Sequence, residues 1–395
     1  MGKLKYILSN AGKFHHFKTG KALYERNQLA KIICGYPWFK LKKENIPKKF
    51  VESYGYFRIL TELFRISSKP VITPSYFQKI EDFINILNAK KVDKITCNYI
   101  DNHEADVLLS LSSVGLNAGK KMVKNNKIYV CERSSAHIVY QNNLLIDEYK
   151  EHAKKEFKMH SWYIERDLKE YENADIILVP STFVKNTFDK FNINKVKVLE
   201  FGADVKNFFP NTNIKKSQKY FDILFIGAKS LRKGLHYLID AFHKFEHPNK
   251  RLHVVGSDTN DKEFFKNKLK HENIIVYGHI NHLKLNDIIN KCHVFVMASI
   301  EDGYGLVVLQ AAAAGCPIIV SENAGASDFV TKNKCGFVVP ARNTNTIADK
   351  LQLFADDKNL LNEFSHNAIS STKAYTWSDY VDKLDDIILK FKNNR

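Results

Sequence analysis

One stretch, residues 298–321, constrains the fold of this chain more than any other. It reads A-S-I-E-D-G-Y-G-L-V-V-L-Q-A-A-A-A-G-C-P-I-I-V-S. The apolar, β-branched residues 293–297 before it predict a buried strand, and residues 318–320 near its end predict a second one. Between them, residues 306–314 contain no Gly or Pro and suit a helix that ends at Gly315. A strand, a helix and a strand in this order are typical of an α/β protein.

The acidic, glycine-bearing loop at residues 301–305 predicts a place for an anion. Its glycines allow the backbone to approach a ligand, and the free N–H groups at the start of the following helix point toward that ligand. Asp302 and Gln310 stand about two helical turns apart, so both side chains can face one cleft. A turn that merely packs a helix on a sheet explains the glycines alone equally well.

Two adjacent cations mark a second place for an anion. A strand expected at residues 221–226 is followed by a turn, then by Arg232 and Lys233, and then by an amphipathic helix expected at residues 234–245. Cations at the start of a helix oppose the helix dipole, so a structure keeps them there most readily when an anion is bound. Two solvated side chains are the alternative.

These two motifs resemble those of family 4 glycosyltransferases, the retaining nucleotide-sugar enzymes of the GT-B fold. The family pattern is an acidic residue, Gly-aromatic-Gly and, about two helical turns after the acid, a Glu. This chain has Asp302 as the acid and Gln310 in place of the Glu, which keeps hydrogen bonding without the charge. The sequence R-K-G at residues 232–234 is similar to the family's diphosphate-binding motif. The resemblance covers nearly the whole chain and is strongest at residues 222–340.

The resemblance implies an α/β chain of the GT-B class, with two Rossmann-like domains that face each other across a cleft. Residues 1–205 are expected to form the N-terminal, acceptor-side domain, and residues 206–372 the nucleotide-sugar-binding domain. Residues 373–395 are expected to form a helix that returns to the first domain.

The resemblance also implies roles for individual residues. For the donor diphosphate it indicates side chains and helix-start N–H groups, namely those of Arg232, Lys233, Gly305, Leu306 and Val307. For the nucleoside it indicates Gln310, Gly278 and Ile280. Catalytic roles fall to His137 and Asp302, and Gly12 belongs to the loop on the acceptor side. It implies no metal ion and no other cofactor, because cationic side chains neutralise the diphosphate in this family.

The first domain opens with a βαβ pattern, in which strands expected at residues 5–8 and 29–34 flank a helix expected at residues 17–26. His15 and His16 come just before that helix. We expect them to be surface or cleft residues and not metal ligands, because no partner stands at a metal-like spacing.

The polar string E-R-S-S-A-H at residues 132–137 follows a strand expected at residues 127–131. The carboxyl ends of parallel strands are where open α/β sheets bind ligands. His137 taken alone is more often a structural histidine, and the resemblance is what favours a place beside the donor sugar. Residues 36–75, rich in Pro, aromatic and basic residues, predict an insertion with one or two helices for substrate specificity or surface docking. Residues 77–88 predict an amphipathic helix.

The formal net charge is +17, and more than half of it falls in residues 1–50. Such a basic region suits an anionic surface, either membrane lipid or nucleic acid, and a solvated basic surface is the alternative. Nothing resembles a nucleic-acid-binding module, so we expect no nucleic-acid partner. No apolar run is long enough to cross a bilayer, no signal-peptide pattern opens the chain, and the six cysteines form no C-x-x-C pair. We expect a cytoplasmic protein that lies peripherally on the inner face of the plasma membrane.

We therefore expect a retaining glycosyltransferase, a hexosyltransferase that moves a sugar from a nucleotide-diphospho-sugar to a glycan or lipid-linked acceptor. Surface polysaccharide, lipopolysaccharide or glycolipid assembly is the expected setting. A nucleotide-sugar enzyme that does not transfer to an acceptor is one alternative. A degenerate partner subunit is another, motivated by Gln310 and by Ala228, where the family commonly has an Arg. A nucleic-acid-binding protein is a further alternative, motivated only by charge.

Overall fold

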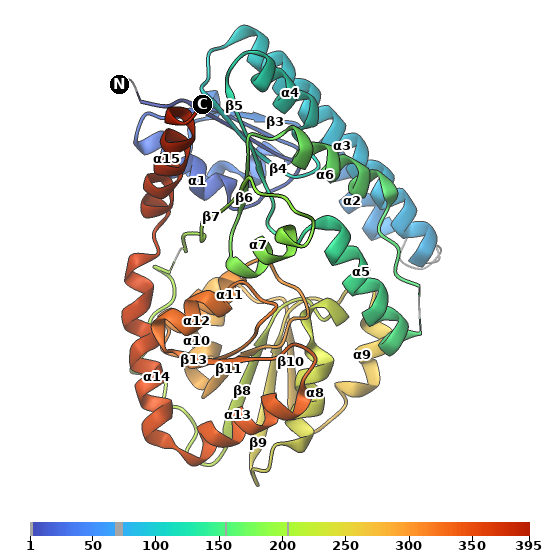
Figure 1. Cartoon of the computed structure of the whole chain (residues 1–395). Coiled ribbons are helices and arrows are strands. Elements are labelled where there is room, and N and C mark those ends of the chain that lie inside the picture. Colours follow the sequence, from blue (N-terminus) through green and yellow to red (C-terminus); the bar gives the residue numbers. More distant parts are fainter. Residues whose placement is uncertain (1–2, 68–73, 155, 204) are drawn as a thin grey trace.

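The computed structural model describes residues 3–67, 74–154, 156–203 and 205–395. Figure 1 shows two α/β domains, one above the other, each built on a parallel sheet. The prediction of two Rossmann-like domains is confirmed.

The sheet of the first domain has the strand order β3-β2-β1-β4-β5-β6-β7, and every pair of neighbours is parallel. Its strands are β1 (Tyr6–Asn10), β2 (Leu29–Cys34), β3 (Val51–Ser53), β4 (Val107–Leu111), β5 (Ile128–Glu132), β6 (Ile176–Val179) and β7 (Val196–Val198). The central strands are buried on both faces, as their continuous Val, Ile and Leu content predicts for a parallel sheet. The direction of winding changes between β1 and β4, which leaves a crevice at the carboxyl edge.

The helices of the first domain are α1 (His16–Glu25), α2 (Tyr56–Ser67), α3 (Pro74–Asn102), α4 (Leu116–Lys124), α5 (Ile138–Glu148), α6 (Ser161–Asn173) and α7 (Thr182–Asp189). Helix α3 continues far beyond the expected end at residue 88, because its second half is anchored on the sheet. The hydroxyl groups of Thr96 on α3 and Ser9 on β1 lie 3.2 Å apart.

The expected insertion at residues 36–75 has little regular structure at its start. It holds three short 3₁₀ turns, then β3, α2 and the start of α3; the turns are η1 (Trp38–Lys40), η2 (Lys42–Glu44) and η3 (Lys48–Phe50). Residues 68–73 of the insertion lie outside the described residues.

The second domain repeats the pattern with the strand order β10-β9-β8-β11-β12-β13. Its strands are β8 (Phe221–Ile226), β9 (Lys250–Val255), β10 (Ile274–Gly278), β11 (Val294–Met297), β12 (Ile318–Ser321) and β13 (Gly336–Val339). Its helices are α8 (Leu235–Lys244), α9 (Lys262–Lys268), α10 (His282–Lys291), α11 (Leu306–Ala313), α12 (Ser327–Asn333), α13 (Thr344–Asp356) and α14 (Lys358–Ser371). The strand, helix and strand expected within residues 293–320 are present as β11, α11 and β12.

Helix α5 was not expected from the sequence, and it packs on the second domain although it follows a strand of the first. Leu145 belongs to the hydrophobic core of the second domain. The carboxylate of Glu148 lies 2.8 Å from His236 and accepts a hydrogen bond from Arg342 at 2.7 Å. The buried positions of α5 include the polar Gln141 and Glu148, so the sequence lacks the continuous apolar stripe that would predict this helix.

The last helix, α15 (Trp377–Asn393), returns to the first domain, as expected (Figure 1). A capping box at Thr376 and Asp379 starts it. Arg26 at the end of α1 binds Asp382 with both terminal nitrogens. None of the helices in the described parts of the chain is long and apolar enough to cross a bilayer.

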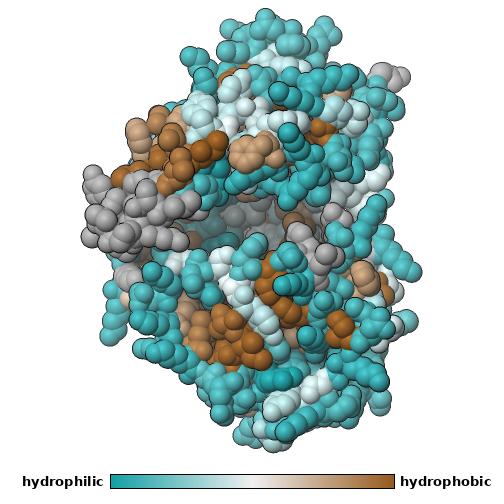
Figure 2. All heavy atoms as spheres, turned by 180° about the vertical axis from the view of Figure 1, so that it is seen from behind, coloured by the Kyte–Doolittle hydropathy of each residue, from teal (hydrophilic) through white to brown (hydrophobic). Residues whose placement is uncertain are grey.

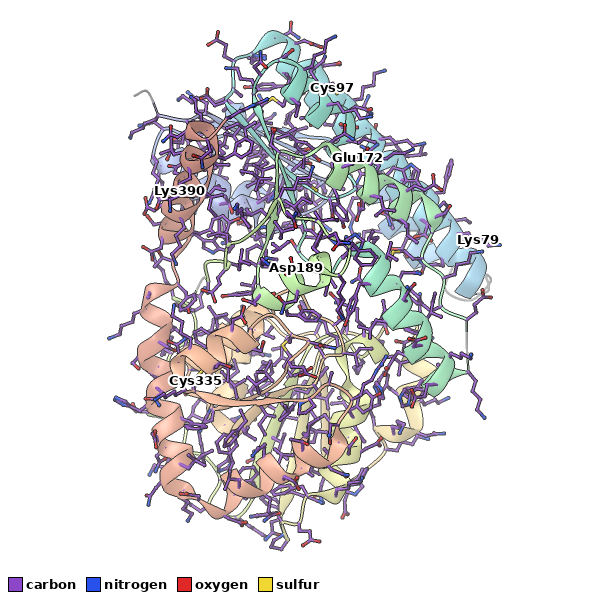
Figure 3. All side chains as sticks on the ribbon, in the orientation of Figure 1. Lys79, Cys97, Glu172, Asp189, Cys335 and Lys390 are labelled. Carbon is purple, nitrogen blue, oxygen red and sulfur yellow. The ribbon has the colours of Figure 1, made fainter. Side chains whose placement is uncertain are left out.

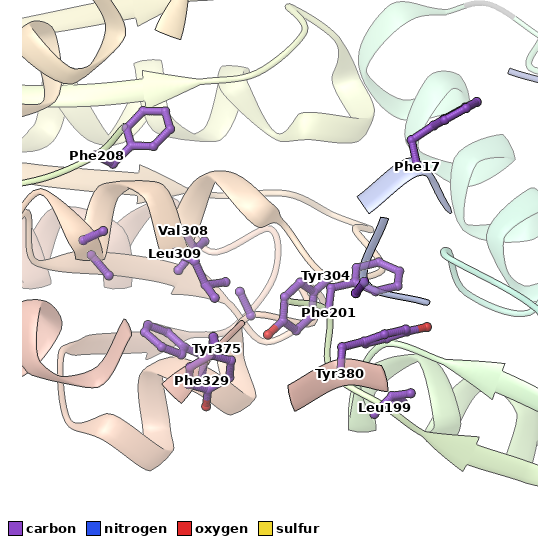
Figure 4. Close-up of a cluster of buried hydrophobic side chains, with 14 of the residues drawn as sticks. Phe17, Leu199, Phe201, Phe208, Tyr304, Val308, Leu309, Phe329, Tyr375 and Tyr380 are labelled. Carbon is purple, nitrogen blue, oxygen red and sulfur yellow. The ribbon is translucent and has the colours of Figure 1, made fainter. Parts of the chain in front are cut away.

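One hydrophobic cluster runs from the first domain into the second, as the close-up in Figure 4 shows. Phe201 lies between Tyr304 of the second domain and Tyr380 of α15, with ring centroids 5.5 Å and 6.3 Å away. Here the chain crosses between the domains twice, side by side. A Cβ atom on Gly202 would lie 2.8 Å from the Cα atom of Trp377, and the Ala203 N–H donates to the Tyr375 carbonyl at 2.9 Å.

The cysteines are unpaired and lie in both domains; Figure 3 labels Cys97 in the first and Cys335 in the second. Burial raises the pKa of Cys97 to about 11 and that of Cys335 to about 12. These thiols therefore stay protonated and act as small packing residues, in line with the sequence-based interpretation.

Candidate active site

The acidic loop 301–305 joins β11 to α11 at the carboxyl edge of the second sheet. Gly305 precedes the helix with φ of +87°, and a Cβ atom there would lie 2.7 Å from the side chain of Met297. Both facts require glycine at this position. The first N–H groups of α11, including those of Leu306 and Val307, have no acceptor within the helix, so this end can bind an anion.

Arg232 and Lys233 from the 3₁₀ turn η5 (Leu231–Lys233) face this loop. Arg232 Nη1 donates to Glu301 Oε2 at 2.9 Å and to the Glu301 carbonyl at 3.1 Å. Lys233 forms an ion pair with Asp302. The predicted neighbourhood of the two cations and the acidic loop is therefore present.

Glycine at position 234 allows this approach. Its φ is +66°, and a Cβ atom would lie 1.8 Å from the carbonyl oxygen of Ala298 at the end of β11. The Ile300 N–H donates to the Arg232 carbonyl at 3.1 Å, which ties the two loops together through the backbone. The R-K-G sequence thus seats both cations against the acidic loop, and no side chain fits in place of the glycine.

The charges in this site alternate in sign, and these neighbours shift the pKa values of Asp302 and Arg232. Burial would raise the pKa of Asp302, but Lys233 and Arg232 outweigh that effect and hold the pKa below its usual range. Burial opposes the charge of Arg232, but Glu301 and Asp302 raise its pKa. Because 33% of the Arg232 side chain is exposed, an anionic ligand can reach it and compete with the carboxylates.

Glu301 is a functional candidate that sequence reasoning missed. Its carboxylate is fully buried and accepts hydrogen bonds from the Ala136 N–H at 2.9 Å and from Gln141 Nε2 at 2.8 Å, besides the bond from Arg232. Arg133 in turn donates to Gln141 Oε1 at 2.8 Å. Glu301 therefore links a cation of the second domain to the segment after β5 of the first domain. The only sequence signal was its place beside Asp302.

The two domains touch through backbone at the same loop. A Cβ atom on Gly303 would lie 1.9 Å from the Ser134 carbonyl oxygen, and Ser181 Oγ donates to the Gly303 carbonyl at 2.8 Å. A Cβ atom on Gly325 would lie 2.0 Å from that carbonyl oxygen. Gly303 and Gly325 thus permit a contact between the domains that larger residues would block.

His137 requires a correction, because it does not line the open face of the site. It has no exposed surface, and its ring stacks on Phe191 with centroids 3.9 Å apart and lies near Phe188 and Tyr171. Neither ring nitrogen has a hydrogen-bond partner. Burial, with a smaller contribution from Arg133, lowers the pKa of His137 to about 4. An uncharged imidazole packed among aromatic rings holds the start of α5 in place.

His15 and His16 also differ from expectation. Both bind the buried carboxylate of Glu132 at the end of β5, with His15 Nε2 at 2.8 Å, and His16 has no exposed surface. Tyr380 of α15 donates to the same carboxylate at 3.2 Å. Burial would raise the pKa of Glu132, but the two histidines outweigh that effect and hold it below its usual range. The cluster lies at the carboxyl edge of the first sheet. Because its members are far apart in the sequence, no local pattern predicted it.

The remaining predicted residues come from separate elements and do not form one cluster. Gln310 is a partly buried residue of α11. Gly278 ends β10 with φ of +68° and open space around its Cα atom, and Ile280 packs against the core. Strands β9 and β8 separate β10 from β11 in the sheet. Gly12 lies in the turn after β1, where a Cβ atom would meet Phe14.

Two groups of side chains in the described ranges have the geometry to hold a metal ion: His15, His16 and Glu132; and Glu148, His152 and His236. In both groups imidazole nitrogens already bind the carboxylate. Arg342 also binds Glu148, and its positive charge opposes a cation there. Neither group touches the loop 301–305.

Two of the open spaces on the surface are a hollow between the domains and a groove beside α12 and α15. Figure 2 shows a hollow between the two domains on the face opposite to that of Figure 1. A separate groove of about 680 Å³ lies where α12, α15 and the first crossing meet, and Glu200, Asp328 and Lys383 are among the residues that line it. That groove does not include Arg232 or Lys233, so it does not mark the anion site.

Comparison with known proteins finds a family match for the second domain. Residues 206–371 match the family model described as Glycosyl transferases group 1. Residues 206–371 are therefore similar to group 1 glycosyl transferases. This domain contains the two cations, the acidic loop and the helix start of the candidate site.

Curated relatives of this domain share about a quarter of its residues. An uncharacterised glycosyltransferase of Methanocaldococcus jannaschii is 26% identical over 232 residues, which cover 54% of this chain and 59% of the relative. The capsular polysaccharide biosynthesis glycosyltransferase CapM of Staphylococcus aureus is 27% identical over 232 residues, 54% of this chain and 60% of the relative. The chain thus spans about three fifths of the length of the curated relatives it matches.

Solved structures show the same fold over the whole chain. Sucrose-phosphate synthase from Thermosynechococcus elongatus superposes with a TM-score of 0.71 at 15% identity and covers 100% of both chains. Anabaena HepE, solved in complex with UDP, superposes with a TM-score of 0.67 at 13% identity and covers 98% of this chain and 100% of the other. The chain therefore has the GT-B fold.

Proposed function

We propose that the chain is a retaining glycosyltransferase that moves a sugar from a nucleotide-diphospho-sugar to a glycan or lipid-linked acceptor. The observation that carries this proposal is the placement of Arg232 and Lys233 against the acidic loop that leads into α11. Two cations and a row of helix-start N–H groups suit a diphosphate. The match to the glycosyltransferase family spans all of these residues.

The proposed chemistry places charge where the reaction develops it. Cleavage of the anomeric bond leaves negative charge on the diphosphate and positive charge on the sugar. Arg232, Lys233 and the N–H groups of Gly305, Leu306 and Val307 would stabilise the diphosphate. Asp302, freed from Lys233 as the donor enters, would contact sugar hydroxyl groups and fix their orientation.

The nucleoside would lie between the edge of β10 and helix α11. Gln310 would hold the ribose through hydrogen bonds, and the backbone of Gly278 and Ile280 would border the base. His137 takes no catalytic role in this proposal, because it is buried and uncharged. Charged side chains supply the electrostatic stabilisation, so the proposal needs neither a metal ion nor another cofactor.

The acceptor would bind at the carboxyl edge of the first sheet, near Gly12. Surface polysaccharide or glycolipid assembly is the proposed setting, in a cytoplasmic protein at the inner face of the membrane. The similar protein CapM is a capsular polysaccharide biosynthesis glycosyltransferase, which supports this setting. The basic excess of residues 1–50 supports a location near anionic lipid.

Thermal shift of the pure protein against UDP-, GDP-, ADP- and dTDP-sugars tests the proposal, because a ligand of the native state raises the melting temperature. One of these nucleotides should raise it, and Arg232→Ala should abolish the rise. Arg251→Ala is the matched control, since Arg251 forms a similar ion pair with Asp222 away from the loop. Release of the nucleoside diphosphate that depends on an acceptor would separate transfer from other nucleotide-sugar chemistry.

A partner subunit without activity is the second candidate. Ala228 lies in the turn after β8, at the position where a third cation was expected from the resemblance. The nearby Lys229 is buried and bound to Asp258 at 2.9 Å. Lys229 therefore cannot replace that cation without breaking its ion pair. No melting shift with any nucleotide would favour this candidate over the enzyme.

A further inference from the structure

In helix α2, residues 56–63, whose side chains the structure describes, present four apolar side chains to solvent. Tyr56, Ile59, Leu60 and Leu63 stand at helical spacing on one face, and each is exposed, Leu63 by 56%. Thr61, a polar residue, is the buried one, and its hydroxyl donates to the Phe57 carbonyl. An ordinary surface helix has the opposite arrangement.

The exposed apolar residues of α2 belong to a larger set. Phe14 follows β1, Phe39 follows β2 and α2 follows β3, and Phe14 and Phe39 are 53% and 60% exposed. Because β3, β2 and β1 are neighbours in a parallel sheet, the segments after them leave the same edge side by side. We call this set the β1–β3 rim: Phe14, Phe39, Tyr56, Ile59, Leu60 and Leu63.

Two contacts hold the rim together. A Cβ atom on Gly55 would lie 2.2 Å from Pro37, so the start of α2 lies against the segment that carries Phe39. Lys13, beside Phe14, forms an ion pair with Glu44 of η2. Figure 2 shows hydrophobic residues gathered on the upper domain next to the hollow between the domains.

Basic side chains stand among these apolar ones. Lys40 stands next to Phe39, and Lys42 and Lys43 belong to η2, whose Glu44 pairs with Lys13 beside Phe14; all three lysines are exposed. Apolar side chains flanked by lysines are the chemistry that binds an anionic lipid surface, where the apolar groups enter the headgroup boundary and the cations meet the lipid phosphates.

We propose that the β1–β3 rim docks on an anionic bilayer, and that the acceptor is therefore a saccharide or alcohol linked to a lipid in that bilayer. The identity of the acceptor rests on the proposed glycosyl transfer. The docking itself is independent of that transfer. The rim lies at the edge of the first sheet where the acceptor would bind. A head group held at the membrane surface would reach the cleft from this side, while the donor enters from the aqueous side.

Co-sedimentation of the full chain with vesicles tests the docking. The wild type should bind vesicles that contain phosphatidylglycerol at least tenfold more tightly than vesicles of phosphatidylcholine alone. Leu60→Glu combined with Leu63→Glu should remove most binding, because it places charge in the inserted face. Leu353→Glu is the control, since Leu353 is an exposed leucine on α13 of the second domain.

The electrostatic part has its own variants. Lys42→Glu with Lys43→Glu should weaken binding by about fivefold or more for each reversed charge, and Lys270→Glu, exposed in the second domain, should not. All variants should keep the wild-type melting temperature and the shift with nucleotide. If no nucleotide shifts the melting temperature of the wild type, this result would count against the proposed enzyme and not against the docking.

The docking proposal is overturned if the wild type binds anionic vesicles no better than neutral ones, or if the Leu60 and Leu63 variant binds as well as the Leu353 variant. It is also overturned if the rim variants convert a dimer to a monomer without any effect on vesicle binding, because a second copy of the chain would then cover the rim.

Discussion

Arg232 Nη1 lies 2.9 Å from Glu301 Oε2, and the same carboxylate accepts hydrogen bonds from Ala136 and Gln141 of the first domain. One buried side chain thus joins the proposed diphosphate cation to the opposite domain. A ligand that draws Arg232 toward itself weakens a bond that also orders the domain contact. Under the proposed function, donor binding and the relative position of the domains would be coupled through Glu301.

Glu301→Gln should destabilise the protein by about 2–4 kcal/mol, because the amide cannot accept every hydrogen bond and leaves Arg232 without its counter-charge. Chemical denaturation of wild type, Glu301→Gln, Arg232→Ala and the double variant measures this. The two single losses should not add in the double variant. Simple additivity would show that the ion pair contributes nothing.

Gly303→Ala should separate the domains at the loop, since its Cβ atom would lie 1.9 Å from the Ser134 carbonyl oxygen. To remove this clash, the backbone of one of the two domains must move, at a cost of about 1–3 kcal/mol. Small-angle scattering should show a larger radius of gyration, and nucleotide affinity should fall. Gly12→Ala serves as control, because its Cβ atom meets only the end of the exposed Phe14 side chain. An unchanged radius for Gly303→Ala would contradict the contact.

Stability should fall as pH drops from about 6.5 toward 4, in part through His137. Its pKa falls from an ordinary 6.5 to about 4 in the folded state, chiefly through burial. Between these values the unfolded chain binds a proton that the folded chain excludes, so the contribution is complete above pH 6.5 and is lost as pH falls. The loss amounts to about 3 kcal/mol at most.

Urea denaturation at pH 7.5 and pH 4.5 measures this loss. His137→Phe, which suits the aromatic surroundings, should reduce the difference between the two pH values, and the exposed His103→Phe should not. Part of the difference should persist, because burial also lowers the pKa of His293 to about 4. Equal acid sensitivity in wild type and His137→Phe would show that His137 titrates normally.

Leu384→Ala should destabilise the first domain although Leu384 lies near the opposite end of the chain. Leu384 is fully buried on α15, which packs on α1. A cavity in such a place costs about 2–5 kcal/mol. Hydrogen exchange should report faster opening of β1 and α1, whereas the exposed Lys392→Ala should leave their protection unchanged. Protection of β1 and α1 equal to wild type would mean that the helix is not part of their core.

The sequence predicted the second domain more accurately than the first. β8 spans the residues expected, and R-K-G and the acidic loop meet as expected, because short-range glycine geometry sets both. Helix α5 was missed because Gln141 and Glu148 occupy buried positions that an apolar pattern would fill. The burial of His137 and the Glu132 cluster depend on residues far apart in the chain, and no local pattern predicts them.

The paired crossings at Ala203 and Tyr375 make the second domain an insertion in the first. The chain leaves the first domain and returns to it at one point, while β1 and α15 both belong to the first domain. The whole second domain can therefore be excised or exchanged by cutting at two adjacent places, with both ends of the chain left undisturbed. A single cut at the first crossing would leave the two pieces held together, because α15 stays docked on α1.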